Sequence, residues 1–326
     1  MRPGPRGSAE EGTGAHFLLY APICVWTGAC YFGILFAEMM QEARKTIWNC
    51  RGRTVEFGPS LVMGILNLTP DSFYAGSRIG GIEETVARGR AFYDAGAVLL
   101  DLGAESTRPG AQPLTPAEEC ERLIPAVIAL RKALPEALLS ADTRHTATAQ
   151  AALEAGVDII NDVSGCAPDE GMLELVAATG AGYVLTHAQG TALSPTPLAD
   201  PTTCTEQVIH DLLTAAHRAE ACGVHPQQIQ LDPGLGFAKS AAVSLQLLKD
   251  TARLAALPYS LMIAASRKRF LGELTGQPDV SQRGAVSLGA ALWAVQAGAN
   301  VVRVHDVRET IDALTLFSRL NTNEDN

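Results

Sequence analysis

Short apolar stretches alternate with longer stretches of amphipathic spacing along this chain from residue 61 onward. Each apolar stretch has the length of a strand and lacks the polar alternation of a sheet with one wet face, which is typical of strands covered on both faces. The predicted strands are residues 61–66, 98–102, 138–141, 159–161, 183–186, 229–231, 261–264 and 301–304.

The longer stretches have the spacing of amphipathic helices, and several of them end at a glycine that follows an Ala-rich turn. Gly96, Gly156, Gly223 and Gly298 are glycines of this kind. The predicted helices are residues 82–95, 116–134, 146–155, 203–222, 241–256, 282–297 and 307–320.

These elements predict an α/β protein built from strand-helix repeats. Eight repeats in about 260 residues is the usual size of a TIM (β/α)8 barrel. A doubly wound sheet of the Rossmann type would carry a glycine-rich phosphate turn after its first strand, whereas this chain has Asn67-Leu-Thr-Pro there. We therefore predict a single barrel domain over residues 47–326.

Residues 1–46 are predicted to be an N-terminal extension outside the barrel. Residues 16–37 contain no Asp, Glu, Lys or Arg, a stretch long enough to span a bilayer, and Arg2 and Arg6 in front of it would suit a signal anchor. Pro22 within the stretch and the lack of a disulfide pattern downstream argue against both readings. The preferred hypothesis is a translation start at Met39 or Met40, with no membrane association, and the intact mass of the native protein tests it.

The composition narrows the possible partners. The net charge of -10, with no strongly basic stretch, argues against a nucleic-acid partner, because nothing would track a phosphate backbone. The seven cysteines form no Cys-x-x-Cys pair, which is typical of reduced thiols in a cytoplasmic protein. An anionic ligand must therefore be met by a local cluster of cations.

Polar or charged side chains stand at or just after the end of nearly every predicted strand. In a barrel these positions converge on one face, so residues far apart in sequence meet there. Any one of them has a plainer explanation as a helix cap or turn residue, but such residues at almost every strand end are hard to explain in that way. The residues are Asn67, Asp101, Asp142, Asn161, His187, Asp232, Lys268, Arg303 and His305.

Three of these residues suit a planar heterocycle. Asp142 and Asp232 with Asn161 offer donors and acceptors to an amidine-like edge, which a carboxylate can grip with both oxygens. Asp142 could instead cap the helix that follows it. The sequence Asp232-Pro-Gly-Leu-Gly-Phe predicts a tight turn that lets backbone approach a ligand closely.

The basic residues and histidines at the strand ends have several possible roles. Lys268 could hydrogen-bond a heterocyclic carbonyl or ring nitrogen, or it could be an ordinary solvated residue at a helix start. Arg303 and His305 alternate along their strand, so they share one face, where they suit a diphosphate. For His187 a packed structural role and a role in the pocket remain equally open.

Several motifs, in one order, resemble the dihydropteroate synthase family of pterin-binding TIM barrels. The resemblance runs from about residue 47 to residue 320 and includes the Asp142 strand end. Its motifs are MGILNLTPDSF, DLGAESTRPGA, GVDIINDVSG, LDPGLGF, SRK and VRVHDV. It implies an enzyme that joins 6-hydroxymethyl-7,8-dihydropterin diphosphate to 4-aminobenzoate, giving 7,8-dihydropteroate and diphosphate in folate synthesis.

The resemblance also implies roles for individual residues. Asn67 is similar to the family's Mg2+ ligand beside the diphosphate. The implied pterin-binding set is Asp142, Asn161, Asp232 and Lys268, the implied diphosphate clamp is Arg108, Arg303 and His305, and the residues implied to close over aminobenzoate are Phe73, Thr107 and Pro109. Catalysis would rest on Asn67, Lys268, Arg303 and His305, in a homodimer.

The chain departs from the family pattern at two places. Ala75 stands where an acidic residue is common, and Ala188 lies near the place of a common Met. Two alternatives therefore remain: a pterin-dependent methyltransferase, or a catalytically silent pterin-binding paralogue. The first has no use for the 107–109 loop, and the second has no use for a diphosphate clamp.

Overall fold

The computed structural model describes residue 1 and residues 47–58, 60–68, 78–105, 113–164, 166–188, 190–191, 194–195 and 198–321. The predicted extension over residues 1–46 lies outside these residues, apart from Met1. None of the described helices is long and apolar enough to cross a membrane. All of the described cysteines are free thiols.

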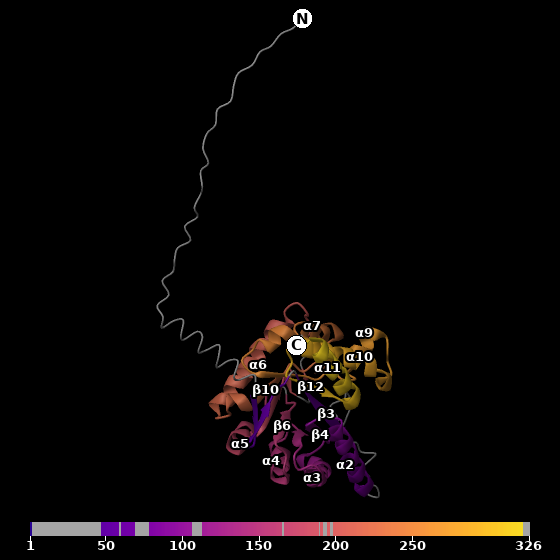
Figure 1. Ribbon diagram of the computed structural model, residues 1–326. Coiled ribbons are helices and arrows are strands. Elements are labelled where there is room, and N and C mark those ends of the chain that lie inside the picture. Colours follow the sequence, from indigo (N-terminus) through magenta and orange to yellow (C-terminus); the bar gives the residue numbers. More distant parts are fainter. Residues whose placement is uncertain are drawn as a thin grey trace, which may run out of the picture. The chain divides into compact units, whose positions relative to one another are not determined.

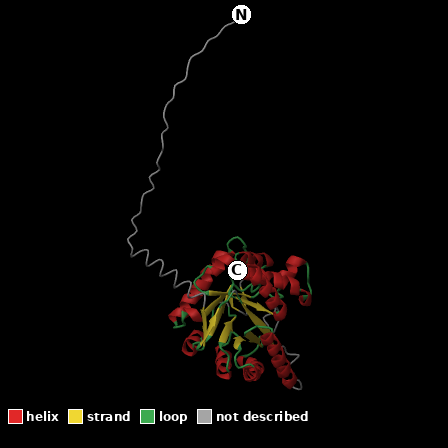
Figure 2. Ribbon diagram, in the orientation of Figure 1, coloured by secondary structure: helices red, strands yellow, loops and turns green. Residues whose placement is uncertain are grey.

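Eight parallel strands form a closed barrel, as predicted, with helices around it (Figures 1 and 2). Each predicted strand is present, with its ends shifted by no more than a residue or so. The barrel strands are β3 (Leu61–Asn67), β4 (Leu99–Gly103), β5 (Leu138–Asp142), β6 (Ile159–Asp162), β7 (Gly182–Thr186), β10 (Ile229–Asp232), β11 (Ser260–Ile263) and β12 (Val301–Val304). The barrel closes through parallel pairing of β12 with β3.

The predicted helices are also present. The stretch predicted as one helix over 241–256 is divided at Asp250, and α5 and α9 were not predicted because they are short. The helices are α2 (Arg78–Asp94), α3 (Pro116–Ala133), α4 (Thr146–Ala155), α5 (Met172–Thr179), α6 (Cys204–Ala221), α7 (Ala241–Lys249), α8 (Thr251–Ala255), α9 (Arg269–Thr275), α10 (Gly284–Gln296) and α11 (Val307–Asn321).

A β-hairpin covers the amino-terminal end of the barrel. Its strands, β1 (Ile47–Cys50) and β2 (Arg53–Glu56), pair antiparallel. Trp48 is fully buried, and its indole N–H donates to the Gln228 carbonyl at 2.7 Å. The indole packs in a cluster with the lowest inward-facing layer of the barrel, which includes Met63, Leu99, Leu138, Ile159, Val184, Met262 and Val301. This end of the barrel is therefore a packed apolar plug.

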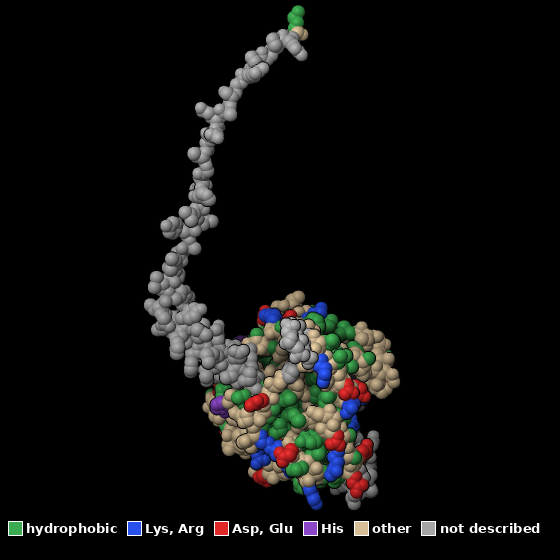
Figure 3. Space-filling model, in the orientation of Figure 1, with side chains coloured by type: hydrophobic (Ala, Val, Ile, Leu, Met, Phe, Trp, Pro, Cys, Tyr) green, Lys and Arg blue, Asp and Glu red, His purple; other side chains and the backbone are tan. Residues whose placement is uncertain are grey.

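The barrel interior becomes polar toward its carboxyl end. Two residues above the apolar layer, Asp101 pairs in register with Ser140, and both are buried. Two residues further on, Gly103 pairs with Asp142, which pairs with Asn161. Since alternate residues face the same side of a strand, these groups line the interior above the apolar plug. Acidic, basic and hydrophobic side chains are interspersed on the face shown in Figure 3.

Candidate functional site

The strand register brings several predicted site residues to one end of the barrel. Asn67 ends β3 opposite Gly103, Gly103 lies opposite Asp142, and Asp142 lies opposite Asn161. Asn67 is exposed at this end. A β-carbon at Gly103 would lie 3.4 Å from the Asp142 Cβ, so the missing side chain leaves room beside the carboxyl group.

Arg303 connects two acidic residues at the centre of this end. Its Nε donates to Asp101 Oδ2 at 2.7 Å, and its Nη2 lies 2.6 Å from the same oxygen. Nη2 also donates to Asp142 Oδ2 at 2.7 Å. Asn161 Nδ2 donates to Asp101 Oδ2 at 3.2 Å. One guanidinium thus holds a buried carboxylate and a partly exposed one, and it does not stand apart as a pure anion clamp.

The same cluster leaves acceptors unused. Asp101 Oδ1 and Asn161 Oδ1 are buried and have no hydrogen-bond partner. Asp142 does not cap the helix after it, since the N-cap of α4 is His145 and no side chain caps there. Burial raises the pKa of the Asp142 carboxyl to about 7, while Arg303 acts to lower it. A ligand edge that donates to this carboxyl would favour its ionised form.

The turn after β10 lets backbone approach closely, as its sequence predicts. Asp232 Oδ1 accepts the Gly234 N–H at 2.8 Å. Gly234 has a φ of 63°, and a β-carbon there would lie 1.9 Å from the His187 carbonyl oxygen. Burial raises the pKa of Asp232, while Lys268 acts to lower it. The turn therefore fixes one face of a buried carboxyl beside a cation.

Lys268 lies over this turn. Its Nζ donates to the Leu235 carbonyl at 2.5 Å and lies 4.7 Å from the centre of the Phe237 ring. Burial lowers the pKa of Lys268 to about 8, and Asp232 acts against that shift. Lys268 is the N-cap residue of α9, but its side chain is partly buried and bonded to the Leu235 carbonyl, so it is not a solvated residue at a helix start. The ammonium is held by one carbonyl and one ring, which leaves it further hydrogens to donate.

His305 follows β12 and contacts the loop after β11. Its Nδ1 lies 3.0 Å from Ser266 Oγ, and its backbone N–H donates to the same oxygen at 3.2 Å. The neighbouring Arg267 forms an ion pair with Asp306. Burial, together with Arg303 and Arg267, lowers the pKa of His305 to about 4, so the ring is neutral at pH 7.

His187 belongs to a supporting network. It is buried, its Nε2 lies 3.1 Å from Asp211 Oδ2, and its Nδ1 has no partner. Lys239 Nζ donates to the carbonyls of His187, Gly234 and Phe237 at 3.0, 2.9 and 3.2 Å. This buried ammonium fastens the β10 turn to the end of β7. The geometry favours the packed role for His187.

Some predicted site residues fall outside the described part of the chain, namely Phe73, Thr107, Arg108 and Pro109. Ala75, at one of the two departures, falls outside it as well. Conversely, three residues that contact the predicted set were given no role in it from the sequence: Asp101, Phe237 and Ser266. Asp101 had the signal of a strand-end carboxylate. Phe237 and Ser266 had only their places inside the motifs LDPGLGF and SRK.

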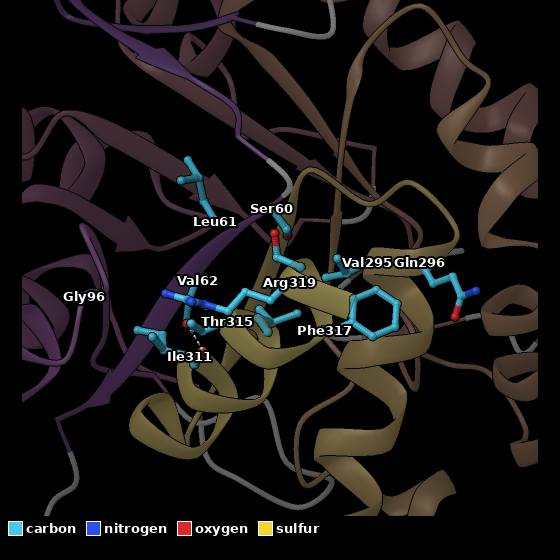
Figure 4. A pocket seen from close by; sticks show the side chains of 12 residues that line it. Ser60, Leu61, Val62, Gly96, Val295, Gln296, Ile311, Thr315, Phe317 and Arg319 are labelled. Carbon is cyan, nitrogen blue, oxygen red and sulfur yellow. Dashed lines mark hydrogen bonds between the residues drawn. The ribbon is translucent and has the colours of Figure 1, made fainter. Parts of the chain in front are cut away.

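A separate hollow lies away from this cluster, between α10, α11 and the start of β3 (Figure 4). Its volume is about 760 Å³. Leu61, Val62, Val295, Ile311 and Phe317 supply apolar walls, and Arg319 lies among them. None of the predicted site residues that the structure describes lines it. The chemistry-bearing residues thus gather at the carboxyl end of the strands, not in this hollow.

The sequence matches the family described as pterin binding enzyme over residues 63–305. Dihydropteroate synthase of Neisseria meningitidis serogroup C is 38% identical over 282 residues, which is 85% of this chain and 98% of that protein. The mitochondrial folate synthesis bifunctional protein of Arabidopsis thaliana is 36% identical over 77% of this chain, and the match spans 48% of its length.

The fold is similar to that of solved structures. Xanthomonas albilineans dihydropteroate synthase with 4-aminobenzoic acid has a TM-score of 0.78 and 38% sequence identity, covering 85% of this chain and 99% of that one. Many unrelated enzymes share the barrel fold, so the fold alone would not show a relationship. Here 38% of the aligned residues are also identical, and the likeness therefore extends beyond the fold.

Proposed function

Because this chain belongs to the pterin-binding enzyme family, and within it to the dihydropteroate synthases, we propose that it condenses 6-hydroxymethyl-7,8-dihydropterin diphosphate with 4-aminobenzoate. The products are 7,8-dihydropteroate and diphosphate, formed in folate biosynthesis. Enzymes of this kind are transferases, and the chemistry is the displacement of diphosphate from carbon by an arylamine.

The observation that carries this proposal is the arrangement of Arg303, Asp101 and Asp142 at the barrel mouth. The Arg303 side chain is 15% exposed, although its partner Asp101 is 0% exposed. A ligand can therefore reach the guanidinium. Beside it are two more polar groups, Asn161 and Lys268. This set offers both signs of charge at one end of the barrel, as a heterocycle bearing a diphosphate requires.

The pterin would be held by Asp142, Asn161, Asp232 and Lys268. The carboxyl groups accept hydrogens from the amidine-like edge, and the ammonium donates to a carbonyl or ring nitrogen. Phe237 beneath Lys268 supplies an aromatic surface for the flat ring. These groups orient the pterin so that its methylene carbon and diphosphate point out of the barrel.

The diphosphate would be met by Arg303 and His305, with Arg108 from the loop after β4. These donors stabilise negative charge as the C–O bond breaks. The electron-rich pterin then supports a cationic methylene, which the neutral amine attacks. Since an arylamine needs no strong base, the proposal asks for no nucleophile–base pair. Phe73, Thr107 and Pro109 would close over aminobenzoate and exclude water.

Mg2+ fits the residues at this end of the barrel. Asn67 is exposed there and offers an amide oxygen, a hard ligand of the kind that Mg2+ accepts. No group of three or more His, Cys, Asp or Glu side chains in the described part of the chain could hold a metal. Such sparse protein ligation suits an ion held mostly by substrate phosphates and water. Asn67 would hold a Mg2+ ion whose positive charge would offset that of the leaving diphosphate.

We further propose that the enzyme is a cytoplasmic homodimer. Large apolar side chains are exposed on α10 and α11, with Trp293 at 52%, Leu316 at 60% and Leu320 at 73% exposure. Covering them by a second copy removes apolar surface from water. Light scattering coupled to gel filtration tests this, and a monomeric mass at micromolar concentration would contradict it.

Turnover tests the proposed function. The full chain, supplied with the dihydropterin diphosphate, 4-aminobenzoate and Mg2+, should release dihydropteroate and diphosphate in equal amounts, and removal of Mg2+ by a chelator should abolish both. Binding of the pterin diphosphate without any product would instead support the silent paralogue.

A further inference from the structure

Ser266 is placed to control the hydrogens of the His305 ring. Ser266 lies in the loop between β11 and α9, and His305 directly follows β12, so the two residues extend from neighbouring strands. The Ser266 hydroxyl oxygen accepts the His305 backbone N–H at 3.2 Å and lies 3.0 Å from the ring Nδ1. The hydroxyl therefore contacts both the backbone N–H and the ring of His305.

The number of hydrogens on the Ser266 hydroxyl determines the direction of its contact with Nδ1. A serine hydroxyl has one hydrogen to donate and can accept two. Ser266 is 8% exposed. Among the described residues, the acceptor within reach of its hydroxyl hydrogen is His305 Nδ1. If Nδ1 carried a hydrogen, the hydroxyl hydrogen would have no acceptor among the described residues, at a cost of about 1 to 3 kcal/mol. The hydroxyl therefore donates to Nδ1, and the neutral ring carries its hydrogen on Nε2.

The ring hydrogen faces the ligand side of the barrel. His305 stands two residues after Arg303, just past the end of β12, and the Arg303 charge acts on its ring, so the two side chains lie near each other. No described residue is bonded to His305 Nε2, and that atom is not among the buried unpartnered ones. Nε2 is therefore accessible to a ligand beside Arg303.

We propose that Ser266 is a positioning residue that fixes His305 in the tautomer with hydrogen on Nε2, so that this N–H donates to the leaving diphosphate. The role of the diphosphate rests on the proposed function, but the tautomer does not. The lowered pKa of His305 agrees with a neutral ring, for which the choice of tautomer decides whether the ligand meets a donor or an acceptor.

Nitrogen NMR of the full chain labelled with 15N-histidine tests the tautomer. The His305 signals are identified by their loss in His305→Gln. In the wild type near pH 7, Nε2 should give a protonated-type signal and Nδ1 an unprotonated-type signal. Ser266→Ala should convert these into a mixture, and Ser266→Thr, which keeps the hydroxyl, should restore them.

Ser287→Ala is the matched control. Ser287 is buried, and its oxygen accepts the Arg267 N–H at 2.8 Å, so it supports the same loop without touching His305. This variant should leave the His305 signals and kcat unchanged. Ser266→Ala should lower kcat about tenfold, the effect of one misdirected hydrogen bond, with an unchanged KM for 4-aminobenzoate.

Hydrogen on Nδ1 in the wild type would overturn the proposal, as would equal losses of kcat in Ser266→Ala and Ser287→Ala with unaltered His305 signals. A wild type that shows the expected signals but forms no dihydropteroate would overturn the proposed function and leave the control of the tautomer by Ser266 standing.

Discussion

Removing the charge of Arg303 should destabilise the whole barrel as well as the ligand site. Arg303→Met keeps a long apolar stem and takes away the guanidinium. Asp101 is 0% exposed and would then keep only the Asn161 amide at 3.2 Å, with its other oxygen already unpartnered. The variant therefore leaves a buried carboxylate with almost nothing to stabilise its charge.

The expected cost is about 3 kcal/mol at pH 7, the lower part of the range for breaking a buried ion pair. The cost lies in the lower part of the range because protonation of a carboxyl group limits the loss of stability. The pKa of Asp142 is about 7 even with Arg303 present, and without the cation this carboxyl stays protonated at neutral pH. The cost should be greatest at high pH, where the Asp142 carboxyl ionises, and should shrink toward pH 5. In a domain of this size it corresponds to a fall in Tm of roughly 6 to 12 °C.

Thermal unfolding followed by circular dichroism at pH 5, 7 and 8.5 measures this effect. The double variant Arg303→Met/Asp101→Asn is the control, because it removes the stranded charge and should recover at least half of the lost stability. A loss below about 1 kcal/mol at every pH, or no recovery in the double variant, would refute the interpretation of this cluster as a buried ion pair.

Three further changes test other parts of the site. Gly234→Ala should cost at least about 2 kcal/mol more than Gly180→Ala, since both have positive φ but only the first drives a β-carbon into backbone; equal Tm losses would contradict this. Lys268→Ala should weaken binding of the pterin diphosphate at least about tenfold by calorimetry, whereas Lys249→Ala on the surface should not, and unchanged affinity in the first would remove Lys268 from the site. Burial lowers the pKa of His187 to about 4, so its contribution to stability is present above pH 6.5 and is lost as the pH falls toward 4. Between pH 7 and 4 the wild type should lose about 3 kcal/mol more than His187→Gln in denaturant titrations, and parallel losses would show that this histidine does not titrate as described.

The barrel was predictable because the local sequence pattern is enough to identify its strands. A run such as residues 61–66 is apolar on both faces, and the glycines after the helices set the spacing of the repeats. The hairpin at residues 47–56 was not predicted. Trp48 is buried only because the open end of the barrel needs a plug, and that need exists in three dimensions and not in the local pattern.

The candidate site was predictable as a set of positions but not as a set of contacts. That Asp142 and Arg303 share one end follows from their places at strand ends. That Arg303 also holds Asp101 depends on barrel closure between β12 and β3, which joins residues 202 positions apart. Phe237 beneath Lys268 depends in the same way on how two turns pack, so sequence alone gave no reason to choose it.

A crystal structure of this chain with 6-hydroxymethyl-7,8-dihydropterin diphosphate would show whether the carboxyl end of the barrel binds the pterin and its diphosphate. We expect the pterin edge to lie on the carboxyl groups of Asp142 and Asp232, with Lys268 Nζ within hydrogen-bond distance of the ring and the diphosphate against Arg303 and His305. A pterin bound elsewhere, with Lys268 and Arg303 keeping only their present protein partners, would contradict it.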